Sequence, residues 1–103
     1  MIRVPIDDAK IQAYCRKWHV TELFIFGSAL REDFRPDSDI DLLITFQPGY
    51  GISFMDRPDM QEEIEAIFGR RVDLIDRKAL DRSQNYLRRE NILNSIESIY
   101  VSR

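Results

Sequence analysis

Two runs of β-branched and aromatic residues limit the folds open to this chain more than any other feature of its sequence. The first, Val20 to Phe26, is followed by Gly27 and predicts a buried strand. The second, Asp39 to Phe46, alternates only in its first half. Asp39 and Asp41 then share one face of a strand, and Ile40, Leu42 and Ile44 share the other. We therefore expect a sheet with one face that is acidic where a strand begins.

Helical patterns surround these two strands. From Asp7 to Trp18, apolar residues recur at helical spacing, which predicts an amphipathic helix that is capped near Asp7 and covers the core. Residues Gln47 to Pro58 are typical of a loop, and Asp59 with Glu62 resembles the capping box that begins a helix. This second helix is expected to run to Phe68.

The last third of the chain predicts one more strand and one long helix. Arg71 to Asp76 is expected to form a short strand, in which Asp73 again places a carboxylate between apolar neighbours. Leu80 to Val101 predicts a helix with a broad apolar face, with Ser83 to Asn85 as a point where it could break. The order of elements indicates an α/β or α+β fold in which helices pack on a small sheet.

Length and composition exclude several classes of protein. With 103 residues the sequence predicts one domain, residues 1–103, because domains usually hold roughly 100–200 residues. No apolar run approaches the ~20 residues that span a bilayer, and no signal peptide is evident at the start, so we expect no membrane contact and a cytoplasmic location. A net charge of −3 argues against a module that binds duplex DNA. Cys15 and His19 are the only residues of their types, which excludes disulfide frameworks and zinc sites of the Cys/His type.

The three aspartates at strand positions are the first candidates for function. Asp39, Asp41 and Asp73 each break the apolar pattern of a strand, and carboxylates are rarely buried without a partner. If the three lie together, they would repel one another unless a cation is present, and Mg²⁺ prefers such hard oxygen ligands. The alternative is that Asp39 and Asp41 lie on an exposed strand edge, with Asp73 on an unrelated rim.

A Gly-Ser pair next to the acidic strand favours a phosphate ligand. Gly27 and Ser28 end a strand and are expected to open a helical turn, whose free N–H groups can hold a phosphate. Ten residues separate Ser28 from Asp39, which gives the pattern G-S-x10-D-x-D. The phosphate-loop pattern G-x-x-x-x-G-K-[ST] is absent, and the dinucleotide pattern of glycines has no matching strand and helix.

These motifs resemble those of a known superfamily. Three segments of the chain are similar to the signature of the DNA polymerase beta-type nucleotidyltransferases: Gly27 to Arg31, the turn Arg35 to Ser38, and Asp39 to Ile44. Val72 to Ile75 resembles the third acidic strand of that superfamily. The similarity is closest to the minimal nucleotidyltransferases and implies their fold, a small mixed sheet with helices packed on it.

The resemblance implies roles for six residues. Asp39, Asp41 and Asp73 would be the catalytic residues and hold two Mg²⁺ ions, and Asp73 would also orient or deprotonate the acceptor hydroxyl. The nucleotide would be ATP, with its phosphates held by Gly27, Ser28 and, as a further contact, Arg31. Arg31 could equally make a local surface ion pair.

The resemblance also implies a partner. Minimal nucleotidyltransferases are often encoded as antitoxins beside a toxin with a HEPN domain, and some inactivate it by transferring AMP to a tyrosine. We therefore expect a type VII-like antitoxin that acts on a HEPN-domain toxin. The alternatives are an antitoxin or binding subunit without catalysis, and nucleotidyl transfer to a small molecule or RNA. The C-terminal apolar face near Tyr100 is expected to pack in the core, or else to dock a partner or a second copy.

Overall fold

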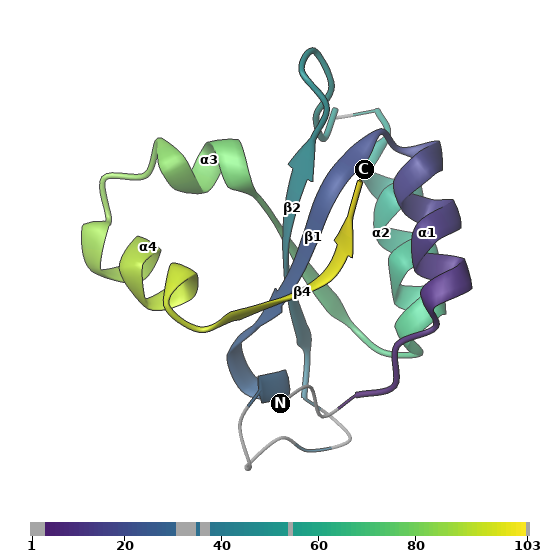
Figure 1. Ribbon diagram of the computed structural model, residues 1–103, viewed down its shortest axis with the longest axis horizontal. Coiled ribbons are helices and arrows are strands. Elements are labelled where there is room, and N and C mark those ends of the chain that lie inside the picture. Colours follow the sequence, from purple (N-terminus) through teal and green to yellow (C-terminus); the bar gives the residue numbers. More distant parts are fainter. Residues whose placement is uncertain (1–3, 31–34, 36–37, 54, 103) are drawn as a thin grey trace.

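The computed structural model describes residues 4–30, 35, 38–53 and 55–102 and shows a four-stranded sheet with helices on both faces (Figure 1). Its elements in chain order are α1 (Asp8–Lys17), β1 (Val20–Phe26), the 3-10 turn η1 (Gly27–Leu30), β2 (Ile40–Phe46), α2 (Arg57–Phe68), β3 (Val72–Asp76), α3 (Arg77–Asp81), α4 (Tyr86–Leu93) and β4 (Ile96–Val101). No helix among the described residues is both long enough and apolar enough to cross a membrane.

The sheet is mixed, and its strand order is β3-β2-β1-β4. β1 runs antiparallel to β2 and to β4, whereas β2 and β3 are parallel and are connected through α2. In Figure 1, α1 and α2 lie on one side of the sheet, and α3 and α4 lie on the other. This arrangement confirms the expected small mixed sheet with helices packed on it.

The core forms one layer on each face of the sheet. The larger cluster of buried apolar side chains includes Leu42 of β2 and Ile64 of α2. The smaller cluster lies under α3 and α4 and consists of Phe26, Leu43, Leu80 and Ile92. Because successive side chains of a strand point to opposite faces, Leu42 faces α1 and α2, whereas Leu43 faces α3 and α4.

Local signals in the sequence fix the start of α1 and the end of α2. The Asp7 carboxylate accepts a hydrogen bond from the Lys10 N–H at 3.2 Å, so Asp7 caps α1 as expected. α2 ends at Phe68, and Gly69 follows it with φ +71°. Glycine adopts this left-handed conformation without the steric cost that a Cβ would bring, which is why it ends helices so often.

The expected start of α2 is wrong. The helix begins at Arg57, with Asp56 rather than Asp59 at its N-cap. The Ser53 hydroxyl accepts a hydrogen bond from the Asp56 N–H at 3.0 Å and donates one to the Asp56 carboxylate at 2.9 Å, which fixes the chain just before the helix. The sequence places Pro58 in the preceding loop, but the structure has it in the first turn of α2. Proline is tolerated there because the amides of a first turn have no partner within the helix.

The C-terminal segment departs most from the expected long helix. The chain does break after α3, as the sequence indicated, and α4 resumes at Tyr86 with the Asn85 side chain as its cap. The last part, however, is the strand β4, which pairs with β1. β1 would otherwise expose a row of unpaired N–H and C=O groups at the edge of the sheet, and this long-range pairing overrides the helical spacing of the apolar residues.

Side chains of α2 form hydrogen bonds with backbone groups on the outer edge of β3. The Glu65 carboxylate accepts a hydrogen bond from the Val72 N–H at 2.9 Å, and the Gln61 amide donates to the Val72 carbonyl. Arg57 donates to the Leu74 carbonyl at 3.4 Å. These bonds occupy backbone groups that a further strand would otherwise use, so the helix protects this edge.

The bond between Glu65 and Val72 predicts a pH dependence of stability. The Val72 N–H, and then the Gln61 amide, stabilise the ionised carboxylate and lower the pKa of Glu65 below its ordinary value of 4.5. A lowered pKa adds stability above pH 4.5, and this stability is lost as the pH falls through the pKa of the folded state. We expect Glu65→Gln to lower the melting temperature at pH 7, with a difference from the wild type that narrows toward pH 3.

The exposed Glu62 on the same helix supplies the control. Glu62→Gln removes an equal charge without touching β3, so its melting temperature should follow that of the wild type across the pH range. A difference between Glu65→Gln and the wild type that stays constant from pH 7 to pH 3 would show that the carboxylate's charge adds nothing to this bond.

Candidate active site

The predicted acidic residues lie at one end of the sheet, where β1 ends and β2 and β3 begin. Asp41 pairs with Phe26 of β1 on one side and with Asp73 of β3 on the other. Directly paired residues on neighbouring strands project from the same face, and Phe26 belongs to the cluster under α3 and α4. Asp41 and Asp73 therefore both project from the face that α3 and α4 partly cover.

Asp39 extends this acidic end of the sheet. It lies just before the first residue of β2 and two residues before Asp41, so the alternation along the chain directs it to the same face. Asp39 and Asp73 are exposed, whereas Asp41 is half-buried. The structure thus contradicts the alternative in which Asp73 belongs to an unrelated rim, because Asp73 is the register partner of Asp41.

Gly27 places the turn η1 directly against Asp41. Its φ is +74°, and a Cβ built on it would lie 3.2 Å from Cγ of Asp41 and closer still to Oδ2. Only glycine combines this left-handed conformation with so close an approach of a neighbouring side chain. The turn and the carboxylate are consequently held in contact, and a ligand that touches one can reach the other.

Of the other two predicted residues, the structure describes only the backbone of Ser28 and does not describe Arg31. The backbone of Ser28 lies in η1, as expected from the predicted helical turn, and its side chain is outside what the structure describes. Arg31 lies outside the described residues, as do Pro36 and Asp37 of the turn that precedes Asp39. The roles of Ser28 and Arg31 toward a nucleotide stay predictions.

The three aspartates offer the oxygen ligands that a hard cation prefers, although they do not form a complete coordination shell. Among the described side chains, no group of three or more His, Cys, Asp or Glu residues lies close enough together to hold a metal ion. Mg²⁺ does not need such a cage, because it commonly takes one or two protein carboxylates and completes its shell with water and substrate phosphates. Asp41 and its neighbours supply oxygen donors of this type on one face.

Sequence reasoning missed a cavity beside the turn. It has a volume of about 670 Å³ and lies between η1 and α4, and its lining includes Gly27, Arg88, Asn91 and Ser95. Arg88 and Asn91 are three residues apart on α4, the spacing that places side chains on one helix face, and Ser95 follows just after the helix ends. The spacing of these polar residues could have indicated the cavity wall, but the prediction for this segment was based on its apolar residues.

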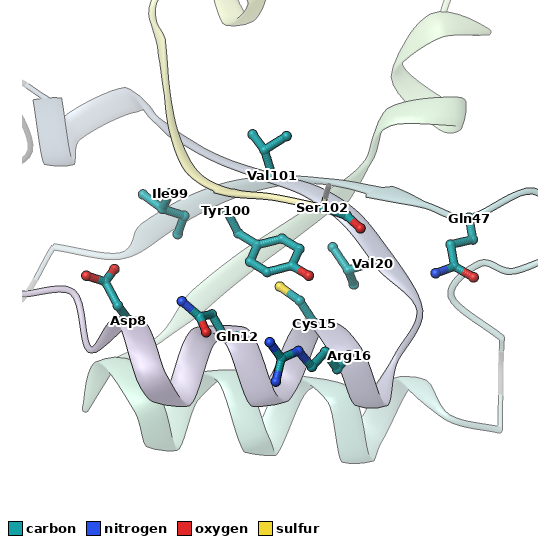
Figure 2. Close-up of a pocket in the computed structure, with 10 residues that line it drawn as sticks. All are labelled: Asp8, Gln12, Cys15, Arg16, Val20, Gln47, Ile99, Tyr100, Val101 and Ser102. Atoms are coloured by element: carbon teal, nitrogen blue, oxygen red, sulfur yellow. The ribbon is translucent and has the colours of Figure 1, made fainter.

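A second cavity lies on the opposite face of the sheet, between α1 and β4, and has a volume of about 640 Å³ (Figure 2). None of the predicted site residues lines it. Burial raises the pKa of Cys15 in its wall to about 12, so that its thiol stays protonated at neutral pH. Tyr100 is partly buried against the larger core cluster, with its ring beside Cys15 in Figure 2, as expected for core packing.

Comparison with known proteins agrees with this geometry. A family model described as a nucleotidyltransferase domain matches residues 9–99. The protein adenylyltransferase MntA of Thermococcus cleftensis is 34% identical over 64 residues, which are 62% of this chain and 63% of that protein. The match therefore spans slightly less than two thirds of that relative's own length.

Solved structures share the fold. A chain of a toxin–antitoxin complex with AMP-PNP superposes with a TM-score of 0.69 at 17% identity, covering 95% of this chain and 76% of that one. A chain of the complex between a tri-AMPylated Shewanella oneidensis HEPN toxin and its MNT antitoxin gives a TM-score of 0.60 at 15% identity, covering 92% and 70%. With the family match over almost the whole sequence, and the Gly-Ser turn held against an acidic strand, this chain belongs to the nucleotidyltransferase domain family.

Proposed function

We propose that this protein transfers AMP from ATP to a tyrosine hydroxyl of a HEPN-domain toxin and thereby acts as its antitoxin. One observation carries the proposal: the turn at Gly27 is held against the carboxylate of Asp41, which is itself paired with Asp73. The relative from Thermococcus cleftensis, named as a protein adenylyltransferase, supports AMP as the transferred group. The fold neighbour in complex with an AMPylated HEPN toxin supports the choice of acceptor.

The chain's own residues would divide the work as follows. The N–H groups at the start of η1 bind the phosphates of ATP, and the missing side chain at Gly27 lets those phosphates approach the backbone. Asp39 and Asp41 would hold the metal. Asp73 lies on the outermost strand of the sheet and is exposed, so the hydroxyl of a large acceptor can reach it.

The reaction requires one bond to form and one to break. The acceptor oxygen bonds to the α-phosphorus of ATP, the bond from that phosphorus to the bridging oxygen breaks, and pyrophosphate leaves. Asp73 orients the hydroxyl and accepts its proton. Bound Mg²⁺ would stabilise the charge on the α-phosphoryl group and on pyrophosphate and would lower the pKa of the acceptor hydroxyl.

Labelled nucleotides test this proposal. We expect label from ATP carrying ³²P at the α-phosphate to enter a HEPN-domain protein of the same genome in the presence of Mg²⁺, and label at the γ-phosphate not to enter it. EDTA should abolish the transfer, and adding Mg²⁺ in excess of EDTA should restore it. If no label is transferred while an Asp39→Ala, Asp41→Ala double variant still neutralises the toxin, the protein acts by binding alone and the proposal is wrong.

A further inference from the structure

The cavity between η1 and α4 adjoins the proposed phosphate turn. Gly27 belongs to its wall, together with Phe26 and Leu30, and α4 and the residues that flank it supply the opposite wall. Phe26 and Ile92, which both line the cavity, belong to the core cluster beneath α4. The cavity therefore lies on the same face of the sheet as Asp41 and Asp73, and a ligand held at the turn can extend into it.

The lining of this cavity is polar on one wall and apolar at its base. The polar groups come from Asn85, Arg88, Asn91 and Ser95. Phe26 and Ile92, both at least nine-tenths buried, provide the apolar surface. No acidic residue is among the described residues that line it. A cavity with a positive charge, a few hydrogen-bonding groups and an apolar base suits a flat heterocycle joined to a phosphate better than it suits a cation or a phosphate chain alone.

The size and side-chain chemistry agree with a nucleoside. Ligand cavities are usually about 300–1,000 Å³, and this one is about 670 Å³. An asparagine amide can donate one hydrogen bond and accept another, which matches the N7 and N6 edge of adenine. A guanidinium can stack on a base or bind a phosphate with two hydrogen bonds. Within the described part of the chain, no ion pair is found for Arg88.

We infer that this cavity holds the nucleoside of the triphosphate, with Asn91 hydrogen-bonded to the adenine edge and Arg88 in contact with the same nucleotide. The inference rests on the proposed function, since it assumes that the phosphates lie at the turn beside Gly27. It adds a substrate preference that the motif residues do not provide: neither the turn nor the aspartates contact the base, whereas α4 distinguishes ATP from other triphosphates.

Calorimetric titration of the intact chain with AMP-PNP in the presence of Mg²⁺ and without any acceptor tests this assignment. We expect Arg88→Ala to weaken binding about ten- to a hundredfold, as for the loss of a charge-assisted contact. Asn91→Ala should reduce the preference for AMP-PNP over GMP-PNP about tenfold, as for the loss of a paired contact to a base edge. Both variants should melt close to the wild type, because the two side chains are exposed.

Arg89 provides the matched control. It is the next residue of α4, does not line the cavity, and donates instead to the Asp81 carbonyl at 3.3 Å. Arg89→Ala removes the same charge and should bind AMP-PNP as the wild type does. Arg88→Ala and Asn91→Ala variants that both bind within twofold of the wild type, without changed base preference, would overturn the assignment. A wild type that binds AMP-PNP but never transfers AMP to protein would instead contradict the proposed function and leave the cavity's role standing.

Discussion

Replacing Asp41 with asparagine is expected to reduce AMP transfer by about a thousandfold or more, equivalent to ~4 kcal/mol of transition-state stabilisation. The substitution keeps the shape of the side chain and its place against Gly27. It removes the negative charge that the proposed Mg²⁺ ion would need at this position, and an amide oxygen is a much weaker ligand for Mg²⁺. Initial rates of label transfer from α-³²P-ATP at saturating Mg²⁺ measure the effect.

The stability of the same variant separates this role from a structural one. Asparagine keeps the shape of the aspartate side chain and its place against Gly27. Asp41→Asn should therefore stay folded and melt close to the wild type while losing activity. Asp59→Asn, an exposed carboxylate in the first turn of α2, serves as the charge-matched control and should keep full activity. Activity within tenfold of the wild type in Asp41→Asn would show that the carboxylate holds no essential metal.

Replacing Gly27 with alanine is expected to cost both stability and activity. The left-handed conformation of this residue disfavours any side chain by about 1–2 kcal/mol, and the new methyl group would also collide with the carboxylate of Asp41. Either the turn or the carboxylate must move. Because a shift of about 1 Å in a reacting group can reduce a rate about a hundredfold, we expect a loss of transfer activity of that size or more, together with a lower melting temperature.

Gly69 allows the two effects of this substitution to be separated. Its φ of +71° is almost that of Gly27, but nothing lies within 4 Å of a Cβ built on it. Gly69→Ala should therefore show the conformational cost alone, as a lower melting temperature with normal activity per folded molecule. If Gly27→Ala lost no more activity than Gly69→Ala, the contact between the turn and Asp41 would have no part in catalysis.

The sequence was most informative where local chemistry decides the structure. Val20 to Phe26 is predicted with both bounds correct, because Gly27 interrupts a run that suits only a strand. Asp7 and Gly69 mark helix ends through side-chain capping and a left-handed backbone, which depend on a few neighbouring residues. The shared face of Asp39 and Asp41 was predictable as well, because side chains alternate along a single strand.

Features that depend on distant contacts could not be predicted in the same way. Ile96–Val101 becomes a strand because β1, far away in the chain, offers it a free edge. The cavity at Arg88 and Asn91 exists because α4 packs beside η1. No local sequence pattern predicts that these two elements are in contact. The pairing of Asp41 with Asp73 likewise follows from strand order and register, and the spacing of the motifs does not reveal either of these.

The intact mass of the partner toxin tests the central claim most directly. A HEPN-domain protein of the same genome is co-expressed with the wild-type chain or with Asp41→Asn, purified, and weighed by mass spectrometry, with fragmentation to locate any modified side chain. We predict that the toxin gains the mass of one or more AMP groups on tyrosine with the wild type and keeps its unmodified mass with the variant. A toxin that is neutralised by the wild type yet remains unmodified, or that is modified equally with Asp41→Asn, would contradict AMP transfer at this site.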